Sequence, residues 1–434
     1  MTLDYDGWII LIGVLVAACC AVPGSWLVVR GMGMMGDAIS HAVLPGIALG
    51  FLISGTRSGG WMFLGAAVSG ILAAAMTQLV HRWGRIEKGA AMGLVFTTFF
   101  SLGLLLIVQT ADTVDLDANC VLYGAIELAP IDTIGLLGID VPRIALPLIA
   151  VLAVNVLLTL LFYKEVLAAS FDPALATAQG FRSTWIHYGL MVVTAATCVA
   201  CFEAVGSIIT VALLVAPPAS ALLLSRRMKW VIVWAVVLGG AAAAGGHVAA
   251  ITVPGWILGG GLDTSSAGMM AVATCGLFLV AAIVAPGRGV LARRWVAHRD
   301  AMRVALEDAL GLLFRMEERS METSRETVES LLRSDVRIGP RRIAAVLSQL
   351  RRGSLAQMEG SSWQLTEAGR AAAGGLVRAH RLWETYLAGR STIPSSHLHA
   401  AAERLEHVTD RDLAKELTAA LGDQREDPHG RPIP

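Results

Sequence analysis

Long apolar runs dominate the first two thirds of this 434-residue sequence and set the strictest limit on its fold. A transmembrane helix needs about 20 mostly apolar residues, and fewer where it is broken or packed among neighbours. Nine segments meet this requirement, at residues 8–29, 41–53, 61–79, 91–108, 144–162, 186–202, 207–224, 230–250 and 269–284. The sequence therefore excludes an ordinary soluble globule and predicts an all-α polytopic membrane protein with about nine transmembrane helices.

Basic residues lie almost entirely on one side of these segments. With the N-terminus outside, the inward loops hold nearly all the Lys and Arg residues before position 295, and only Arg57 and Arg143 lie outside. We expect a bacterial cytoplasmic membrane, with everything after residue 285 in the cytoplasm. The moderately apolar stretch 120–138 leaves one alternative open. A re-entrant or interfacial helix there keeps this topology, whereas another crossing inverts everything downstream.

Charge separates the chain into two parts. Residues 1–294 hold 14 basic and 14 acidic side chains, whereas the shorter stretch 295–434 holds 20 of each. The second part has the composition of a soluble domain of ordinary size. The expected division is a membrane domain (1–292), a linker (293–302) and two soluble domains (303–370 and 371–434).

Ionisable residues inside apolar segments are costly and are candidates for function. Asp37 and His41 are four residues apart, so a helix places both on one face, in a pattern that suits a divalent Mn, Zn or Fe ion. A buried Asp–His hydrogen bond explains the spacing equally well. Glu203 and His247 are weaker candidates. Pro217 and Pro218 remove amide donors and predict a broken helix beside a polar pathway.

Four stretches in order resemble the permease subunit of the manganese/zinc/iron class of ABC importers. They are RGMGMMGDAISHAVLPGIALG (30–50), FDPALATAQGF (171–181), VGSIITVALLVAPPASALLL (205–224) and APGRGVL (285–291). The resemblance covers residues 5–292. It implies a homo- or heterodimeric permease that receives a divalent metal from an extracellular metal-binding lipoprotein and is driven by a separate cytoplasmic ATPase.

The same resemblance assigns roles to particular residues. Asp37 and His41 would line the metal path, and the segment containing Asp172, Pro173, Gly180 and Phe181 would rest on the ATPase. The family usually has a phenylalanine-glycine-acidic run after the fourth span, where this chain has residues 122–125 without an acid. The sequence holds no GxxxxGK[ST] phosphate loop, so we expect a transporter subunit rather than an enzyme.

The soluble part begins with a winged-helix pattern. Periodic apolar positions predict helices at 302–316, 327–332 and 340–350, followed by a hairpin at 356–365 around Gly360-Ser361. Arg341 and Arg342 begin the third helix, which in this layout enters a DNA major groove. A charged helix is also an ordinary solvated face, so nucleic-acid binding stays an open alternative.

Histidine and carboxylate residues then gather on two predicted helices. His380 and Glu384 are four residues apart, and His399, Glu403 and the pair Glu406/His407 share a stripe on the next helix. Such a set can surround one or two divalent ions through oxygen and nitrogen. The alternative is ordinary surface charge that happens to align.

This region resembles metal-dependent repressors of the diphtheria-toxin-repressor and manganese-repressor type. LTEAGRAAA, RAHRLWETYL, AAERLEHVTD and DPHGRPIP occur in order over residues 303–434. The resemblance implies that His380, Glu384, His399, Glu403, Glu406 and His407 are metal ligands, with Asp308 from the first helix. Glutamate at position 403 favours manganese, with iron or zinc as the other candidates. Gly311 stands where the manganese type has a carboxylate, so that ligand is either missing or replaced by Glu307.

The sequence thus predicts a metal permease fused to a cytoplasmic metal-responsive domain. A membrane-tethered metal-dependent repressor is the alternative, although nine spans with an intramembrane Asp–His pair exceed what an anchor needs. A secondary carrier driven by an ion gradient is a third possibility.

Overall fold

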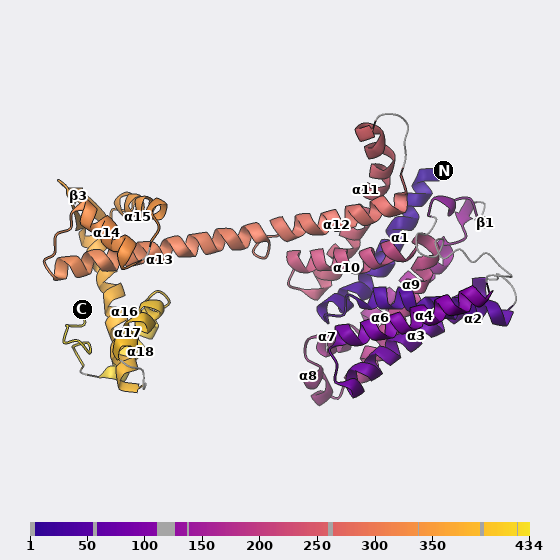
Figure 1. The fold of residues 1–434 in the computed structure, drawn as a ribbon, viewed down its shortest axis with the longest axis horizontal. Coiled ribbons are helices and arrows are strands. Elements are labelled where there is room, and N and C mark those ends of the chain that lie inside the picture. Colours follow the sequence, from indigo (N-terminus) through magenta and orange to yellow (C-terminus); the bar gives the residue numbers. More distant parts are fainter. Residues whose placement is uncertain are drawn as a thin grey trace. The chain divides into compact units, whose positions relative to one another are not determined.

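The computed structural model describes residues 5–54, 59–110, 126–136, 139–258, 264–336, 338–390, 395–422 and 424–434. The chain divides into two compact units, Met1–Ala292 and Arg293–Pro434, and each is described by itself (Figure 1). The departure expected at residues 122–125 lies outside the described residues.

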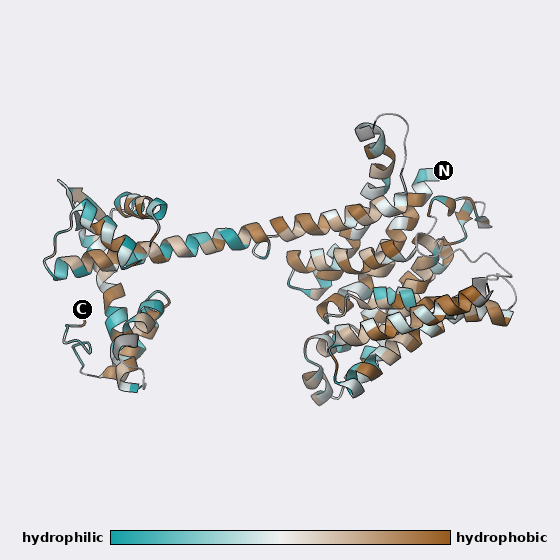
Figure 2. Cartoon of the chain, viewed as in Figure 1, coloured by the Kyte–Doolittle hydropathy of each residue, from teal (hydrophilic) through white to brown (hydrophobic). Residues whose placement is uncertain are grey.

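The membrane unit is a bundle of apolar helices (Figure 2). Its helices are α1 (Tyr5–Val29), α2 (Met35–Ser54), α3 (Gly59–Gly84), α4 (Lys88–Thr110), α6 (Ala145–Leu161), α7 (Tyr163–Phe171), α8 (Pro173–Ala178), α9 (Ser183–Val205), α10 (Ser207–Leu224), α11 (Met228–Leu258) and α12 (Ser266–Val284). Eight described helices are long and apolar enough to cross a membrane, and α6 with α7, bent by 75°, makes a ninth candidate. The nine predicted helical segments are confirmed.

The connection before α6 differs from the expected interfacial helix. Within 126–136 and 139–142 the chain forms a short 3-10 helix, η1 (Ile126–Leu128), and an antiparallel hairpin of β1 (Thr133–Leu136) and β2 (Ile139–Pro142), with Thr133 opposite Pro142. The closely spaced Pro130, Gly135, Gly138 and Pro142 explain this, because glycine and proline disfavour a helix interior.

The proline pair in α10 was expected to break the helix, and this prediction is wrong. Helix α10 is continuous through Pro217 and Pro218. Pro218 lacks the N–H that would bond the carbonyl of Leu214, and Gly24 of α1 packs against that carbonyl. A Cβ at Gly24 would lie 2.1 Å from the Leu214 oxygen, so only glycine permits this approach. Close α1–α10 packing thus accommodates the freed carbonyl without a break.

Helix α1 forms the centre of the membrane core. Most of its residues from Ile12 to Leu27 are buried, including Val16, Cys20 and Trp26. Many α4 and α12 side chains are exposed instead, among them Leu104 and Leu279. This pattern fits a bundle whose outer helices face lipid, where exposed apolar side chains carry no penalty.

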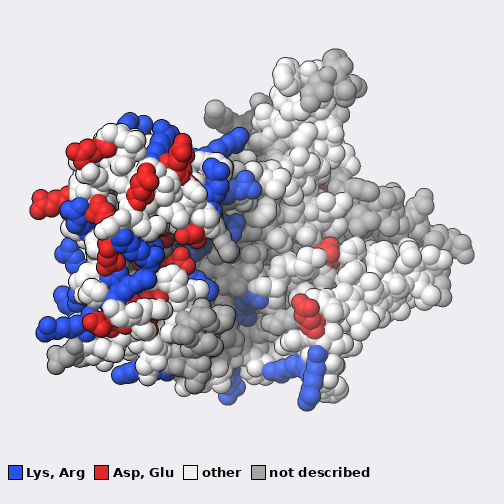
Figure 3. Space-filling view, turned by 60° about the vertical axis from the view of Figure 1, so that its left-hand side comes forward, with Lys and Arg blue, Asp and Glu red and all other residues white. Residues whose placement is uncertain are grey.

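The second unit is rich in charge, unlike the membrane unit (Figure 3). It contains α13 (Val290–Glu318), α14 (Arg325–Ser334), α15 (Pro340–Arg352), β3 (Ala356–Glu359), β4 (Ser362–Leu365), α16 (Glu367–Arg390), α17 (Ser395–Glu406) and α18 (Arg411–Leu421). Strands β3 and β4 pair antiparallel, and Gly360 has φ +62° at their turn. Three helices and a two-stranded wing are the predicted winged-helix arrangement.

Two of the expected domain boundaries fall inside helices. Residues 293–302, expected as a linker, are helical and belong to α13, because they contain no glycine or proline. The boundary at 370/371 falls inside α16, which extends from the wing into the metal-binding region. The winged helix and the helical region therefore share one helix.

Candidate metal sites

The Asp37–His41 pair lies in the first two turns of α2. His41 Nε2 is 3.6 Å from Asp37 Oδ1, and the side chains are 29% and 38% exposed, respectively. The His41 ring packs against Phe96 and Phe100 of α4, each with its centroid 5.3 Å away. Ser40 donates to the backbone oxygen of Asp37 and does not join the pair. The structure therefore brings the two predicted residues together on a half-open face.

Proline and glycine position this part of α2. Pro45 lacks the N–H that would bond the carbonyl of His41, which leaves that oxygen without its helical donor. The next residue, Gly46, packs so closely against Gly65 of α3 that a Cβ on it would lie 2.1 Å from the Gly65 oxygen. The Ser69 hydroxyl of α3 also donates to Ala42 O at 2.5 Å. Backbone contact with α3 thus fixes the helix that carries the pair.

The segment expected to contact an ATPase forms the short exposed helix α8. Asp172 caps it, because its Oδ1 accepts from the amides of Ala174 and Leu175 at 3.0 and 2.9 Å. Pro173 occupies the first helical turn, where no amide donor is needed. Gly180 has φ +89°, and Phe181 N–H bonds Ala176 O at 3.0 Å to close the other end. The four predicted residues therefore build one rigid, surface-exposed turn of helix.

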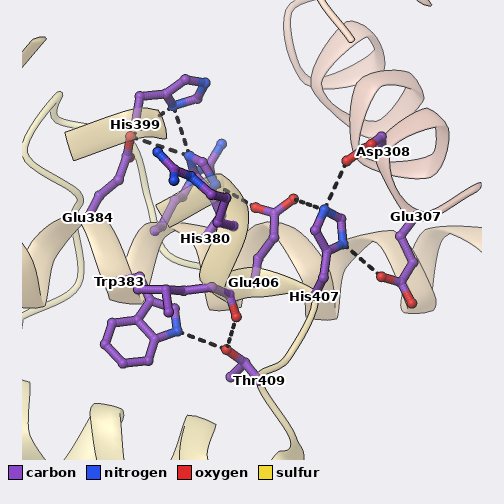
Figure 4. A network of polar contacts seen from close by, with 12 residues as sticks. Glu307, Asp308, His380, Trp383, Glu384, His399, Glu406, His407 and Thr409 are labelled. Atoms are coloured by element: carbon purple, nitrogen blue, oxygen red, sulfur yellow. Dashed lines mark hydrogen bonds and ion pairs between the residues drawn. The ribbon is translucent and has the colours of Figure 1, made fainter. Parts of the chain in front are cut away.

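The soluble unit holds a first candidate metal site between α13 and the end of α17. Asp308, Glu406 and His407 place one ligand atom each within 4.8 Å of one another. His407 Nε2 is 3.1 Å from Asp308 Oδ1 and 3.8 Å from Glu406 Oε1 (Figure 4). Two ligands at about 2.1 Å from one ion, at angles of about 90° to 110°, lie about 3.0 to 3.4 Å apart. The donors therefore nearly match the spacing around a single divalent ion.

Glu307 is adjacent to this site but does not replace the ligand missing at Gly311. Its Oε2 is 2.7 Å from His407 Nδ1, the ring nitrogen opposite to the one that faces Asp308 (Figure 4). A ligand to the same ion must approach Nε2, so Glu307 orients the ring from behind. A Cβ at Gly311 would be 3.3 Å from Leu376 Cδ2, which shows that this position packs against α16.

A second candidate site lies next to the first. His380, Glu384 and His399 gather their ligand atoms within 4.8 Å. His380 Nε2 is 3.3 Å from Glu384 Oε1, and His399 Nδ1 is 3.0 Å from the same oxygen. The other nitrogen of His380 donates to Glu406 Oε2 at 2.5 Å. Glu406 thus joins the two sites into one continuous polar network (Figure 4).

A third group contains residues that sequence reasoning missed. Glu384, Asp427 and His429 also place ligand atoms within 4.8 Å, with His429 Nδ1 3.8 Å from Glu384 Oε2. Asp427 is buried, and its Oδ1 accepts from the amides of His429 and Arg431 at 2.8 Å each. The segment DPHG had been noted only as part of a family pattern. An acid two residues before a histidine was the signal that could have found it.

Glu403 lies four residues from both His399 and His407, so it shares their stripe in and just after α17, as expected. It is exposed and belongs to none of the three groups found among the described residues. Arg341 and Arg342 are likewise exposed, in the first turn of α15. Glu203 is exposed near the end of α9.

Protonated histidines compensate the buried carboxylates in this network. Burial opposes the charge of His380, but hydrogen bonds to Glu384 and Glu406 outweigh it and raise the pKa to about 9. The hydrogen bond to Asp308, helped by Glu307 and opposed by burial, raises the pKa of His407 to about 9. Burial would raise the pKa of Glu384, yet its bonds to His380 and His399 hold it well below its usual value. A divalent ion bound to these donors would replace the imidazolium charges.

Comparison with known proteins identifies both parts of the chain. Residues 4–285 match the family model of the ABC 3 transport family, and residues 366–434 match the metal binding and dimerisation domain of iron dependent repressors. The chain belongs to the ABC 3 transport family. The expected resemblance to an ABC metal permease with a repressor-like tail is confirmed, as is a multi-pass membrane protein.

Several relatives carry names that specify metals. The zinc transport system membrane protein TroD of Treponema pallidum is 37% identical over 362 residues, which cover 83% of this chain and 96% of that protein. The manganese transport system membrane protein MntD of Bacillus subtilis is 42% identical over 216 residues, 50% of this chain and 73% of MntD. The solved structure of PsaBC from Streptococcus pneumoniae, in complex with Fab, matches with TM-score 0.54 and 28% identity, over 68% of this chain and 95% of that one.

Proposed function

We propose that this chain is the permease subunit of an importer for divalent transition metal ions, with manganese favoured and zinc or iron as alternatives. Family membership and the Asp37–His41 pair on a half-open face of α2 support this function. In this proposal the carboxylate, the imidazole and the carbonyl of His41 offer hard-to-borderline donors to the passing ion. No step in it requires the chain to hydrolyse ATP.

The proposal includes three partners and an orientation. A cytoplasmic ATPase would dock on α8, whose capped and exposed turn suits a rigid coupling surface. An extracellular metal-binding lipoprotein would deliver the ion, and a second permease chain would complete the path. The positive-inside distribution of Lys and Arg supports an orientation with the N-terminus outside and the soluble unit in the cytoplasm.

We further propose that the soluble unit senses the imported metal. The ligand groups around Asp308, Glu406 and His407 and around His380, Glu384 and His399 support this, because all but the exposed His399 are buried or partly buried and hydrogen bonds connect the two groups. A metal that binds one arrangement of the tail more tightly than another would shift the balance between them. Import would then slow when cytoplasmic metal is replete.

Uptake of radiolabelled manganese by cells that express the chain with its ATPase and lipoprotein tests both parts. Asp37→Asn and His41→Gln should abolish uptake, whereas Glu87→Gln, an exposed change in the same unit away from both candidate sites, should retain it. Glu406→Gln with His407→Gln should leave uptake at low manganese unchanged and raise accumulation at high manganese. Wild-type accumulation at every concentration in that double variant would refute sensing.

The repressor alternative is tested with the same chain. The exposed Arg341 and Arg342 would have to read an operator, so DNA binding with and without manganese, measured across salt concentrations, separates the two functions. Operator-specific affinity lost in an Arg341→Ala/Arg342→Ala variant would favour the repressor. Salt-sensitive binding of equal strength to all DNA sequences would argue against the repressor function.

A further inference from the structure

A buried histidine in the membrane unit has one ring nitrogen without a hydrogen-bond partner among the residues that the structure describes. His247 lies in α11 and is 2% exposed. Its Nδ1 is 2.9 Å from Ser266 Oγ at the start of α12. Its Nε2 is buried, accepts or donates no hydrogen bond within the described part of the chain, and lies 3.5 Å from Asp6 Oδ1 in the first turn of α1. The two atoms face each other across a gap too long for a good hydrogen bond.

The gap has the size that one metal ion requires. When Nδ1–H donates to the Ser266 hydroxyl, the Nε2 lone pair points at a carboxylate, so two acceptors face each other. Nitrogen and oxygen ligands at about 2.1 Å from a tetrahedral ion lie about 3.4 Å apart. A divalent cation between Nε2 and Oδ1 would therefore satisfy both groups. The Asp6 side chain is 64% exposed, so water can complete the coordination.

Other carboxylates lie at the end of the membrane unit that holds Asp6 and His247, and they favour a cation at this position. The Glu127 carboxylate accepts a hydrogen bond at 2.7 Å from the backbone amide of Ser266, the same serine whose hydroxyl contacts His247. The membrane helices alternate in direction, so the ends of α9 and α11 and the starts of α1, α6 and α12 lie on one side. Among the described residues this side carries several acids against one base; the acids are Asp6, Glu127, Asp132, Asp140 and Glu203, and the base is Arg143. Such an excess raises the local concentration of cations.

We propose that Asp6 and His247 form a receiving site for a divalent transition metal ion at this end of the membrane unit. The inference rests on the proposed transport function for its cargo and for placing this end outside. Two protein ligands plus water bind an ion weakly, which suits a site that accepts the cargo and passes it on. His247 is a weak candidate from the sequence because a lone histidine in a span is usually satisfied by packing, and its neighbour Asp6 is distant in the chain.

The test measures ions bound per full-length chain in lipid nanodiscs, with manganese or cobalt as the only added metal. Asp6→Asn and His247→Gln should each lose about one ion equivalent relative to wild type. The matched controls Asp300→Asn and His298→Gln, at exposed positions outside the membrane unit, should lose none. Because Asp6 is largely exposed, its variant should fold even where the histidine variant does not.

Two further readouts decide between a metal site and a structural ion pair. In cells, Asp6→Asn should raise the external manganese needed for half-maximal uptake several-fold while the maximal rate persists. If both variants bind the wild-type number of ions, the receiving site is refuted, even if their thermal stability falls. Failure of wild-type cells to take up metal would refute the transport function instead, and the ion count would still test the site.

Discussion

Arg381 contacts α13 and the C-terminal segment from α16, so replacing it should destabilise the soluble unit. Its side chain is 3% exposed and forms a two-pronged pair with Glu318 of α13, at 3.0 Å from Nη1 and 2.6 Å from Nη2. Its Nε is 3.7 Å from Asp427, and Nη1 donates to Pro432 O at 2.5 Å. Arg381→Met would therefore leave a buried Asp427 carboxylate without its cation.

An exposed arginine–glutamate pair from the same two helices provides a control for the buried Arg381 pair. Arg370 of the same helix pairs with Glu317 at 3.0 Å, but its side chain is 56% exposed. Breaking a buried pair costs about 3–5 kcal/mol, and an exposed one about 0.2–1 kcal/mol. Glu318 is 32% exposed and can rehydrate, so we take the lower figure for Arg381→Met, about 3 kcal/mol. Each 1.4 kcal/mol is about tenfold in an equilibrium constant.

Hydrogen exchange of α16 amides in the metal-free full chain measures this difference. Under conditions where exchange follows the opening equilibrium, Arg381→Met should lower protection about 100-fold, whereas Arg370→Met should lower it at most about fivefold. Equal losses in the two variants would show that burial of the Arg381 pair does not stabilise the unit. A loss confined to residues after 424 would show that Arg381 anchors only the C-terminal segment.

Three other predictions follow from the contacts described above. The pKa values of His380 and His407, raised to about 9, mean that their protons stabilise the metal-free unit fully below the usual imidazole pKa. That contribution should be lost as pH rises through about 9, seen as a falling melting temperature, while manganese affinity rises because fewer protons must leave. Glu307→Ala should weaken manganese binding about 10- to 100-fold by freeing the ring of His407, and Glu329→Ala, at an exposed pair, should not change it. Gly24→Ala should destabilise the membrane unit by at least about 1–3 kcal/mol in thermal unfolding, whereas Gly245→Ala, with open space around it, should be tolerated.

The spans, the winged helix and its hairpin could be predicted from the sequence because each depends on local periodicity. Apolar length alone marks a membrane helix, and the turn at Gly360 marks the wing. The continuity of α10 could not be predicted, since it depends on Gly24, almost 200 positions away, packing against the freed carbonyl. Local rules report the cost of a proline but not how tertiary contact accommodates it.

The candidate sites show the same difference between what local spacing predicts and what tertiary packing decides. Spacing alone placed Asp37 beside His41 and His380 beside Glu384, because i and i+4 are neighbours on any helix. Spacing alone could not show which members of the α17 stripe gather their ligand atoms, since Glu403 is exposed and lies outside the three groups found among the described residues. It also missed the role of Glu307, which follows from the ring nitrogen it contacts rather than from its position in the chain.

The two metal-handling regions differ in how firmly they can hold an ion, and burial explains why. In the soluble unit the Glu384 and Glu406 side chains are 3% exposed and surrounded by imidazole partners, so removing a bound ion would leave charges that only protons can compensate. Asp37, 38% exposed, can instead be hydrated when an ion leaves. A pathway needs ready release, and a sensor needs retention at low free metal. Under the proposed function, the half-open pair in the membrane unit and the buried network in the soluble unit would meet both requirements within one chain.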